Sequence, residues 1–199
     1  FIKIDQDTKT IPKIEQKVIS LSNDSKLSYL IKHLETQNGL MLVFVKTKRG
    51  AKKLAKDLYK KGFEADAIHG DLRQNKRTNV IKKFRSNKIQ ILVATDVAAR
   101  GLDIPNIEHV INYDLPQQPE DYIHRIGRTG RAGAKGQAWS YVTNSDKKQW
   151  REIEKILNPG KKSLFDNERN KKPYIKKNKF NRAKKFKFNL FNISNSWRF

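Results

Sequence analysis

The stretch LMLVFVKTKRGAKKLAKDLYKKG, residues 40–62, joins a strand pattern to a helix pattern and indicates the fold class. Residues 40–46 are apolar almost throughout, which is typical of a strand covered on both faces of its sheet. From residue 47 the apolar positions follow a helical period, and Gly62 stands where a helix C-cap belongs. These positions are Ala51, Leu54, Ala55 and Leu58. A strand followed directly by a helix predicts an α/β unit.

The same alternation continues on both sides of this unit. Strand patterns occupy residues 17–22, 64–70, 89–96, 109–116 and 137–143, and helical patterns occupy residues 25–35, 72–87, 119–127 and 145–157. Alternating strands and helices imply right-handed crossovers and a mostly parallel sheet with helices on both faces. We therefore predict a three-layer α/β/α domain over residues 17–157, preceded by a leader or linker at residues 1–16.

Residues 158–199 have a different composition. They carry 13 Lys and Arg against 2 Asp and Glu, interleaved with aromatic side chains and without a sustained period. We expect a disordered basic tail that anchors RNA, because lysines contact phosphates and aromatic rings stack on bases. The alternative is an unconstrained lysine-rich end without a function.

The whole chain of 199 residues has a net charge of +23, which favours a nucleic-acid partner. The alternative is a surface on which lysine only increases solubility. The absence of cysteine excludes disulfides and thiolate metal sites and favours a reducing compartment. No apolar run approaches the length of a membrane span, so we expect a soluble, cytoplasmic protein without a membrane partner or a metal site of its own.

Polar residues follow four of the predicted strands. In open parallel sheets ligands bind beyond the carboxyl ends of the strands. The candidates there are Thr47, the segment 69–71, the segment 95–96 and Asp114.

The segment HRIGRTGR, residues 124–131, has the form of an anion clamp. Arg125, Arg128 and Arg131 stand three apart, so in a helix they would fan over one side, and the two intervening glycines would let another surface approach. Planar guanidinium groups bind polyphosphates in bidentate fashion. The alternative is a surface network in which the arginines pair with nearby carboxylates such as Asp121.

No phosphate-binding G-x-x-x-x-G-K-[ST] loop and no acidic Mg²⁺ motif in the required context occur in the sequence. Alone, therefore, the chain is not expected to bind and split a nucleoside triphosphate.

Four segments in order and spacing resemble the DEAD-box RNA helicases. They are MLVFVKTKRGAKKLAKDL (41–58), HGDLRQNKR (69–77), LVATDVAARGLDIPNIEHVINYDLP (92–116) and HRIGRTGRAG (124–133). The resemblance covers roughly residues 15–157 and implies the second RecA-like domain of this family. It also implies that ATP, with Mg²⁺, is held mostly by an N-terminal RecA-like domain, the partner that carries the P-loop and the Asp-Glu-Ala-Asp box.

The resemblance implies roles at the ATP site. Arg128 and Arg131 match the arginine fingers that lie against the γ-phosphate, and Asp103 matches the residue that accepts hydrogen bonds from the ribose. His124 is implied to bridge to the acidic box of the partner domain, and Arg100 to help join the two domains. For Asp103 the alternative is a cap of its own turn. For Arg125 we favour a structural pair.

RNA contacts are implied at the same sheet edge. Gln74 and Arg77 match a Q-x-x-R element, Gly70 offers backbone close to a phosphate, and Thr47 and Thr95 offer hydroxyls. Contacts to phosphate and sugar alone give binding that is independent of sequence. The alternatives are a helix N-cap for Thr47 and a plain solvated charge for Arg77.

The sequence thus predicts the C-terminal half of an ATP-dependent RNA helicase, which would complete the ATP site and help unwind short RNA duplexes. The alternative is a stand-alone RNA-binding or helicase-regulating module without catalysis. Two positions depart from the family pattern: Trp139 replaces a smaller aliphatic residue, and Asn87-Lys88 stand where a glycine is common. Neither has an implied role, but Trp139 makes the local packing hard to predict.

Overall fold

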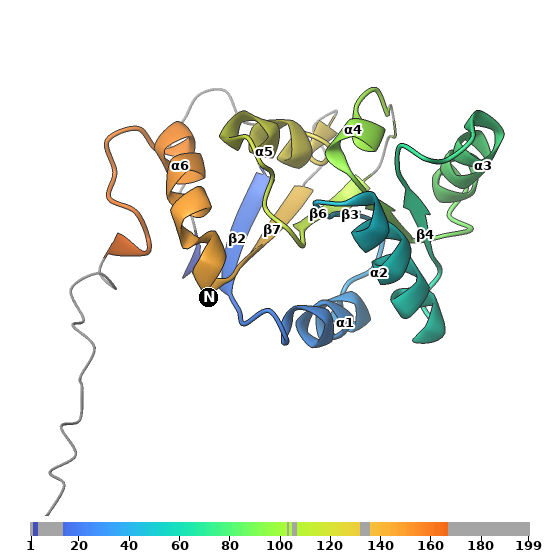
Figure 1. The fold of residues 1–199 in the computed structure, drawn as a ribbon, viewed down its shortest axis with the longest axis horizontal. Helices are drawn as coiled ribbons and strands as arrows, with labels where there is room; N and C mark the ends of the chain where they lie inside the picture. The colour runs from blue at the N-terminus through green and yellow to red at the C-terminus, as the bar shows by residue number, and fades with distance from the viewer. Residues whose placement is uncertain (1, 4–13, 103, 105–106, 132–135, 167–199) are drawn as a thin grey trace, which may run out of the picture. The chain divides into compact units, whose positions relative to one another are not determined.

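A computed structural model describes residues 2–3, 14–102, 104, 107–131 and 136–166. These residues form one sheet in the order β1-β2-β7-β6-β3-β5-β4 (Figure 1). The strands are β1 (Ile2–Lys3), β2 (Ile14–Ser20), β3 (Leu40–Phe44), β4 (Ala65–Ile68), β5 (Ile91–Ala94), β6 (Ile107–Asn112) and β7 (Gly136–Val142). Strands β2 to β7 are parallel and β1 is antiparallel to β2, which confirms the mostly parallel sheet.

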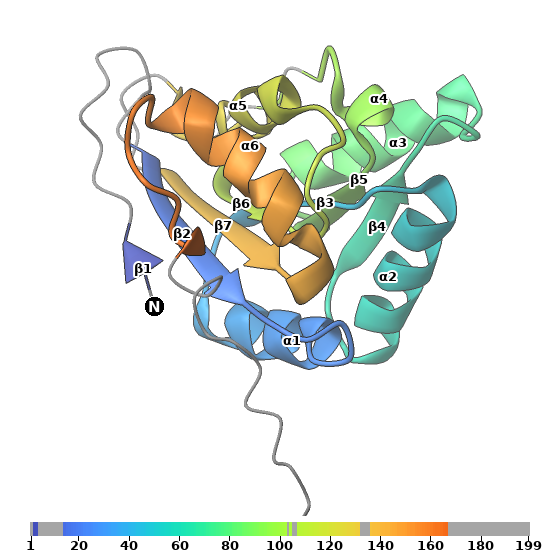
Figure 2. The same cartoon turned by 60° about the vertical axis from the view of Figure 1, so that its left-hand side comes forward.

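Helices cover both faces of the sheet (Figures 1 and 2). They are α1 (Lys26–Thr36), α2 (Lys48–Lys60), α3 (Gln74–Arg85), α4 (Asp96–Ala99), α5 (Pro119–Ile126) and α6 (Lys147–Leu157). Helices α1 and α2 pack on one face, and α3 to α6 pack on the other. The predicted three-layer α/β/α architecture is therefore confirmed.

Strand β3 shows why this sequence requires two helical layers. Met41 and Val43 pack among the α1 and α2 residues, whereas Leu42 and Phe44 pack among those of α3 and α4. Successive side chains of a strand point to opposite faces, so an unbroken apolar run is buried only where both faces are covered. Each such side chain contributes about 1.5–3 kcal/mol by leaving water.

The packed domain extends past both ends expected from the sequence. Strand β2 begins at Ile14, where it pairs with Gly136, three residues before the expected start. At the other end Phe165 is buried beside α6, and the backbone N–H of Leu164 donates to Glu154 at 3.1 Å. A single apolar side chain after a turn has no period, so sequence periodicity does not reveal this contact. Residues 167–199, and with them most of the expected tail, lie outside the described residues.

Helix α4 was also not predicted, because four residues are too few to show a period. No helix in the described part of the chain is long and apolar enough to cross a membrane.

Trp139 is accommodated on the α1 face of the sheet. Its ring lies 4.0 Å from the His33 ring, centroid to centroid, and the Lys17 ammonium lies 4.4 Å from its centroid. His33 is itself buried, and its Nδ1 atom lies 3.2 Å from the Tyr141 hydroxyl. The large indole is thus contacted by a buried histidine ring and by the ammonium group of a lysine.

His33 makes the stability of the fold pH-dependent. Burial, assisted by the nearby charges of His109 and Lys17, lowers the pKa of His33 from 6.5 to about 4. The unfolded chain therefore binds this proton at a higher pH than the folded chain, and acid favours unfolding between these two values. From about pH 7 to about pH 4.5 we expect His33 alone to cost about 2 kcal/mol of unfolding free energy.

Urea unfolding of the wild-type chain and of His33→Phe at both pH values measures this contribution. The variant should lose less stability on acidification, although the His109 pKa, also lowered by burial, leaves part of the slope. Equal slopes for the two proteins would contradict the assignment.

Candidate functional site

The carboxyl ends of four neighbouring parallel strands bring the sequence-predicted residues to one edge of the sheet. Thr47 follows β3, Gly70 follows β4, Thr95 follows β5 and Asp114 follows β6. Because these strands run in the same direction, their ends lie at the same edge, as ligand sites of open parallel sheets do. Two groups of residues can be distinguished there, one around α5 and one around α3.

Arg125 lies inside the protein beneath the first group. Its Nε and Nη2 atoms donate to the two carboxylate oxygens of Asp96 at 2.6 and 2.8 Å. Its Nη1 atom donates to Asn112 Oδ1 at 3.1 Å and to the Asp114 carbonyl at 2.6 Å. The guanidinium also stacks over the Phe44 ring at 4.8 Å, and only 2% of Arg125 is exposed. Arg125 thus joins α5 to α4 and to the end of β6. This agrees with the structural role that the sequence favours for it.

The expected fan of three arginines over one side of a helix is wrong. Helix α5 ends at Ile126, with Gly127 as its C-cap, so Arg128 and Arg131 follow the helix rather than belong to it. Arg125 points inward and the other two do not. The nearby carboxylate Asp121 pairs with Arg100 at 3.0 Å, and Arg125 pairs with Asp96 instead, so the carboxylate contact of Arg125 lies inside the protein rather than in a surface network.

Arg128 and Arg131 form a local concentration of positive charge. Arg128 is half-buried and its Nη1 atom donates to the Leu102 carbonyl at 3.2 Å, while the exposed Arg131 donates from Nε to the Gly127 carbonyl at 3.0 Å. Burial and the charge of Arg131 lower the pKa of Arg128. Two guanidinium groups that repel each other at close range favour an anion between or beside them.

Thr129 holds the turn that carries these arginines, and no signal in the sequence marks this role. Its buried hydroxyl is within hydrogen-bond distance of two carbonyl oxygens, at 2.6 Å from Ile107 and 2.9 Å from Glu108. The neighbouring Gly130 has φ +69°, a conformation that favours glycine, and a Cβ atom on Gly136 would come within 2.5 Å of its nitrogen. The backbone conformation therefore requires glycine at position 130, and close packing against Gly130 requires glycine at position 136.

Arg100, His124 and Arg128 line one shallow depression together with Ala99. His124 is exposed, and so is the Arg100 side chain of the ion pair with Asp121, whereas the Asp121 side chain is 19% exposed. The structure therefore brings together the residues expected at the domain junction and one of the two expected fingers. Asp103 lies outside the described residues, and so its expected contact with a ribose has no structural counterpart here.

The second group gathers around α3. Arg77 donates from Nη2 to the Ala98 carbonyl at 2.6 Å and is half-buried, so the alternative of a plain solvated charge is wrong. Gln74 is the first residue of α3 and is exposed. Gly70 is exposed, and a Cβ atom added there would meet no atom within 4 Å. Packing within the described residues therefore leaves space above Gly70 for a ligand.

The two threonines were expected to offer hydroxyl groups to RNA, but each has a structural role at the start of a helix. Thr47 Oγ1 accepts a hydrogen bond from the Gly50 N–H at 3.0 Å, so it is the N-cap of α2, which was the alternative for this residue. It remains exposed. Thr95 is 9% exposed, and its carbonyl starts α4 by accepting from Ala98 and Ala99.

Asp114 follows a strand end and was therefore a candidate to bind a ligand, but in the structure it joins other parts of the protein. It accepts hydrogen bonds from Lys26 Nζ and from the backbone N–H of Lys46, each at 3.1 Å. Lys26 is buried and also lies 3.7 Å from Asp146. No sequence signal identified this contact, because its partners lie far apart in the chain. Within the described residues no three His, Asp or Glu side chains gather as a metal site would require.

Comparison with known proteins identifies the family to which the sequence is similar. Residues 25–133 match the helicase conserved C-terminal domain family. The chain is 46% identical over 155 residues to the DEAD-box ATP-dependent RNA helicase CshA of Bacillus cereus, covering 77% of this chain and 30% of that relative. The chain thus spans about a third of the length of this relative.

Solved structures show the same fold. A DEAD box protein of Methanococcus jannaschii superposes with a TM-score of 0.69 at 48% identity, covering 73% of this chain and 40% of that one. A variant of S. cerevisiae Dbp5, solved bound to RNA and ADP BeF3, superposes with a TM-score of 0.69 at 36% identity, covering 74% of this chain and 40% of that one. The chain therefore belongs to the helicase conserved C-terminal domain family and has the RecA-like fold of the C-terminal domains of DEAD-box proteins.

Proposed function

We propose that this domain works within an ATP-dependent RNA helicase, where it completes the ATP site with two arginines and holds the RNA backbone. The observation that carries this proposal is the pair Arg128 and Arg131 on a turn anchored by Thr129. An N-terminal RecA-like domain would hold the nucleotide and its Mg²⁺ on the opposite side. Asp103, if it contacts the ribose as expected, would belong to the same site.

In this proposal the arginines stabilise negative charge that develops on the transferred phosphoryl group. The half-buried position of Arg128 strengthens this effect, because charges interact more strongly where water is partly excluded. His124 and Arg100 lie in the same depression and would contact the partner domain. Closure of the two domains would then be needed to assemble the catalytic groups.

The RNA side of the proposal rests on the α3 group. Gln74 and Gly70 are exposed beside open space, and Arg77 is held in a defined position. Such groups contact phosphate and sugar and give binding that is independent of sequence. Thr47 would add a hydroxyl contact as a donor, since its oxygen already accepts from Gly50, whereas Thr95 is 9% exposed and offers little surface to RNA. S. cerevisiae Dbp5, a structural relative, was solved with both RNA and ADP BeF3.

Helix α4 offers a physical link between the two sides. Its Asp96 binds Arg125, which belongs to the arginine-bearing segment, and its Ala98 carbonyl binds Arg77 of the RNA side. Movement of this four-residue helix would therefore affect both groups. We infer that RNA and ATP favour one closed arrangement, in which a bent RNA strand separates a few base pairs and hydrolysis restores the open state.

Gln74→Ala tests the RNA assignment. Loss of one hydrogen bond to a charged phosphate should weaken binding of single-stranded RNA about tenfold, because such bonds contribute about 1.5–3 kcal/mol. Fluorescence anisotropy with labelled RNA measures the dissociation constant. Asn79→Ala, an exposed amide on the same helix, is the matched control and should bind as the wild type does. Equal affinities for the two variants would remove Gln74 from the RNA site.

A further inference from the structure

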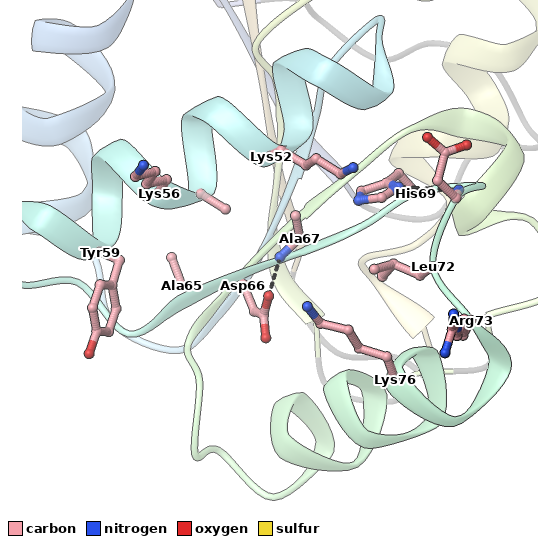
Figure 3. Close-up of a pocket in the computed structure, with 12 residues that line it drawn as sticks. Lys52, Lys56, Tyr59, Ala65, Asp66, Ala67, His69, Leu72, Arg73 and Lys76 are labelled. Carbon is pink, nitrogen blue, oxygen red and sulfur yellow. Dashed lines mark hydrogen bonds between the residues drawn. The ribbon is translucent and has the colours of Figure 1, made fainter.

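A groove runs along the free edge of the sheet, between α2 and α3 (Figure 3). It has a volume of about 530 Å³. Its walls carry four basic side chains, Lys52 and Lys56 from α2 and Arg73 and Lys76 from the start of α3. We call it the edge groove. None of the residues that line the edge groove belongs to the proposed ATP and RNA sites, although three of them are sequence neighbours of Gly70 or Gln74.

The floor of the edge groove is formed by β4. This strand pairs with β5 alone among the described strands. The carbonyls of Glu64 and Ile68 accept hydrogen bonds from the β5 side, so the backbone N–H and C=O groups of the alternate residues Ala65 and Ala67 point to the free edge, while their side chains point to the α2 face of the sheet. Their methyl groups leave room above the strand. The Ala67 N–H is already bonded to the Asp66 carboxylate at 2.8 Å, and an added β-strand would have to displace that bond.

The charge of the edge groove is predominantly positive. Its two carboxylates are both engaged, Asp66 with the Ala67 N–H and Asp71 with Lys48 at 2.9 Å. His69 is buried at one end of the edge groove. Burial is the main cause that lowers the pKa of His69. The charges of Lys52, Lys48 and Lys76 lower this pKa further, and the charge of Asp71 opposes them.

An exposed aromatic ring stands at the other end of the edge groove. Figure 3 shows Tyr59 beyond Lys56 and Ala65, away from His69 and Arg73. Tyr59 is 66% exposed. Seven residues of helix separate it from Lys52, a rise of about 10 Å along α2. Aromatic rings beside basic side chains are typical of surfaces on which single-stranded bases stack.

The edge groove is continuous with the proposed RNA site. His69 and Asp71 flank Gly70, and Arg73 directly precedes Gln74. We propose that the RNA strand continues from the strand-end contacts into the edge groove, where Lys52 and Lys56 bind its phosphates and Tyr59 stacks on a base. This inference rests on the proposed RNA-binding function. The exposed ring and the occupied Ala67 N–H favour RNA over an acidic peptide added to β4.

Protection from alkylation locates the RNA on the surface. The sequence has no cysteine, so Lys56→Cys, Lys53→Cys and Gln74→Cys each introduce a single thiol into the full chain. Lys53 is exposed on the same helix and does not line the edge groove. Single-stranded RNA of about 15 nucleotides should slow maleimide alkylation severalfold in K56C and Q74C and leave K53C unchanged.

The outcomes separate the two proposals. Protection of Q74C without K56C would overturn the edge groove and leave the RNA-binding function standing. If RNA protected neither thiol, both the edge groove and the proposed RNA site would be overturned. Stronger protection of K56C by a polyglutamate peptide than by RNA at equal concentration would overturn the inference in favour of an acidic protein partner.

The salt dependence of RNA binding gives a second, independent measure. Each phosphate contact on a single strand adds about 0.7 to the slope of log K against log salt, so Lys52→Ala with Lys56→Ala should reduce the slope by about 1.4. Lys53→Ala with Lys60→Ala removes the same charge from exposed positions of α2 outside the edge groove. Tyr59→Ala should weaken binding about fivefold without changing the slope. Equal slopes for the two double variants would overturn the proposal.

Discussion

Arg131→Ala should remove most of the RNA-stimulated ATP hydrolysis of a two-domain protein in which this chain follows a DEAD-box N-terminal domain. An arginine finger contributes a factor of about 10³–10⁵ in related nucleotide hydrolases, because it stabilises charge that is present only in the transition state. Steady-state phosphate release at saturating RNA measures the effect. Arg131 is exposed and follows α5, so its removal should leave the fold intact.

RNA affinity must be measured beside this rate. The proposed RNA contacts lie around α3, and so Arg131→Ala should bind RNA nearly as the wild type does. Arg131→Lys should restore little activity, since an ammonium group lacks the planar bidentate geometry of guanidinium. Lys53→Ala, an exposed change on α2, is the control and should keep full activity. An equal loss of hydrolysis and of RNA binding would contradict the finger assignment.

Arg125→Ala should destabilise the domain by about 3–5 kcal/mol. Arg125 is buried and Asp96 is 25% exposed, and removal of the arginine leaves this partly buried carboxylate without compensation and without two hydrogen bonds at once. The Asn112 side chain and the Asp114 carbonyl lose a donor as well. Urea unfolding of the chain, followed by circular dichroism, gives the change in unfolding free energy.

Arg100→Ala is the matched comparison for Arg125→Ala. It also removes one arginine from a pair with an aspartate at 3.0 Å, but the Arg100 side chain is 64% exposed. The two remaining aspartates are similarly covered, with Asp121 19% and Asp96 25% exposed, so the comparison isolates the position of the arginine. Because water reaches the Arg100 end of its pair, we expect this variant to lose only about 1 kcal/mol. If the two variants lost similar stability, the buried position of Arg125 would not be the cause.

Much of the architecture could be predicted from periodicity because burial imposes it. Residues 40–46 can be apolar throughout only if helices cover both faces of the sheet, and the spacing of Ala51, Leu54, Ala55 and Leu58 gives α2 its buried side. The errors occur where no period exists. Helix α4 has four residues, and Phe165 packs as a single side chain after a turn.

The sequence predicted which residues belong to the candidate site better than it predicted where their side chains point. Repeated arginines in residues 124–131 indicate an anion site, but the same spacing does not tell which arginine points inward. Arg125 turns inward because α5 ends one residue later and because Asp96 and Asn112 offer acceptors there. These acceptors lie 29 and 13 residues away in the chain.

The sequence by itself determined most of the strands and helices of the domain, and that its sheet is mostly parallel, because burial acts on each segment through its own apolar pattern; it did not reveal β1 or α4, which are too short to show one. Tertiary structure alone decided which polar groups meet. The bonds of Arg77 to the Ala98 carbonyl and of Thr129 to the start of β6, and the edge groove beside β4, all depend on residues that are brought together only by the sheet order. A hydrogen bond requires atoms within about 3 Å of each other, and only the packed fold provides that proximity.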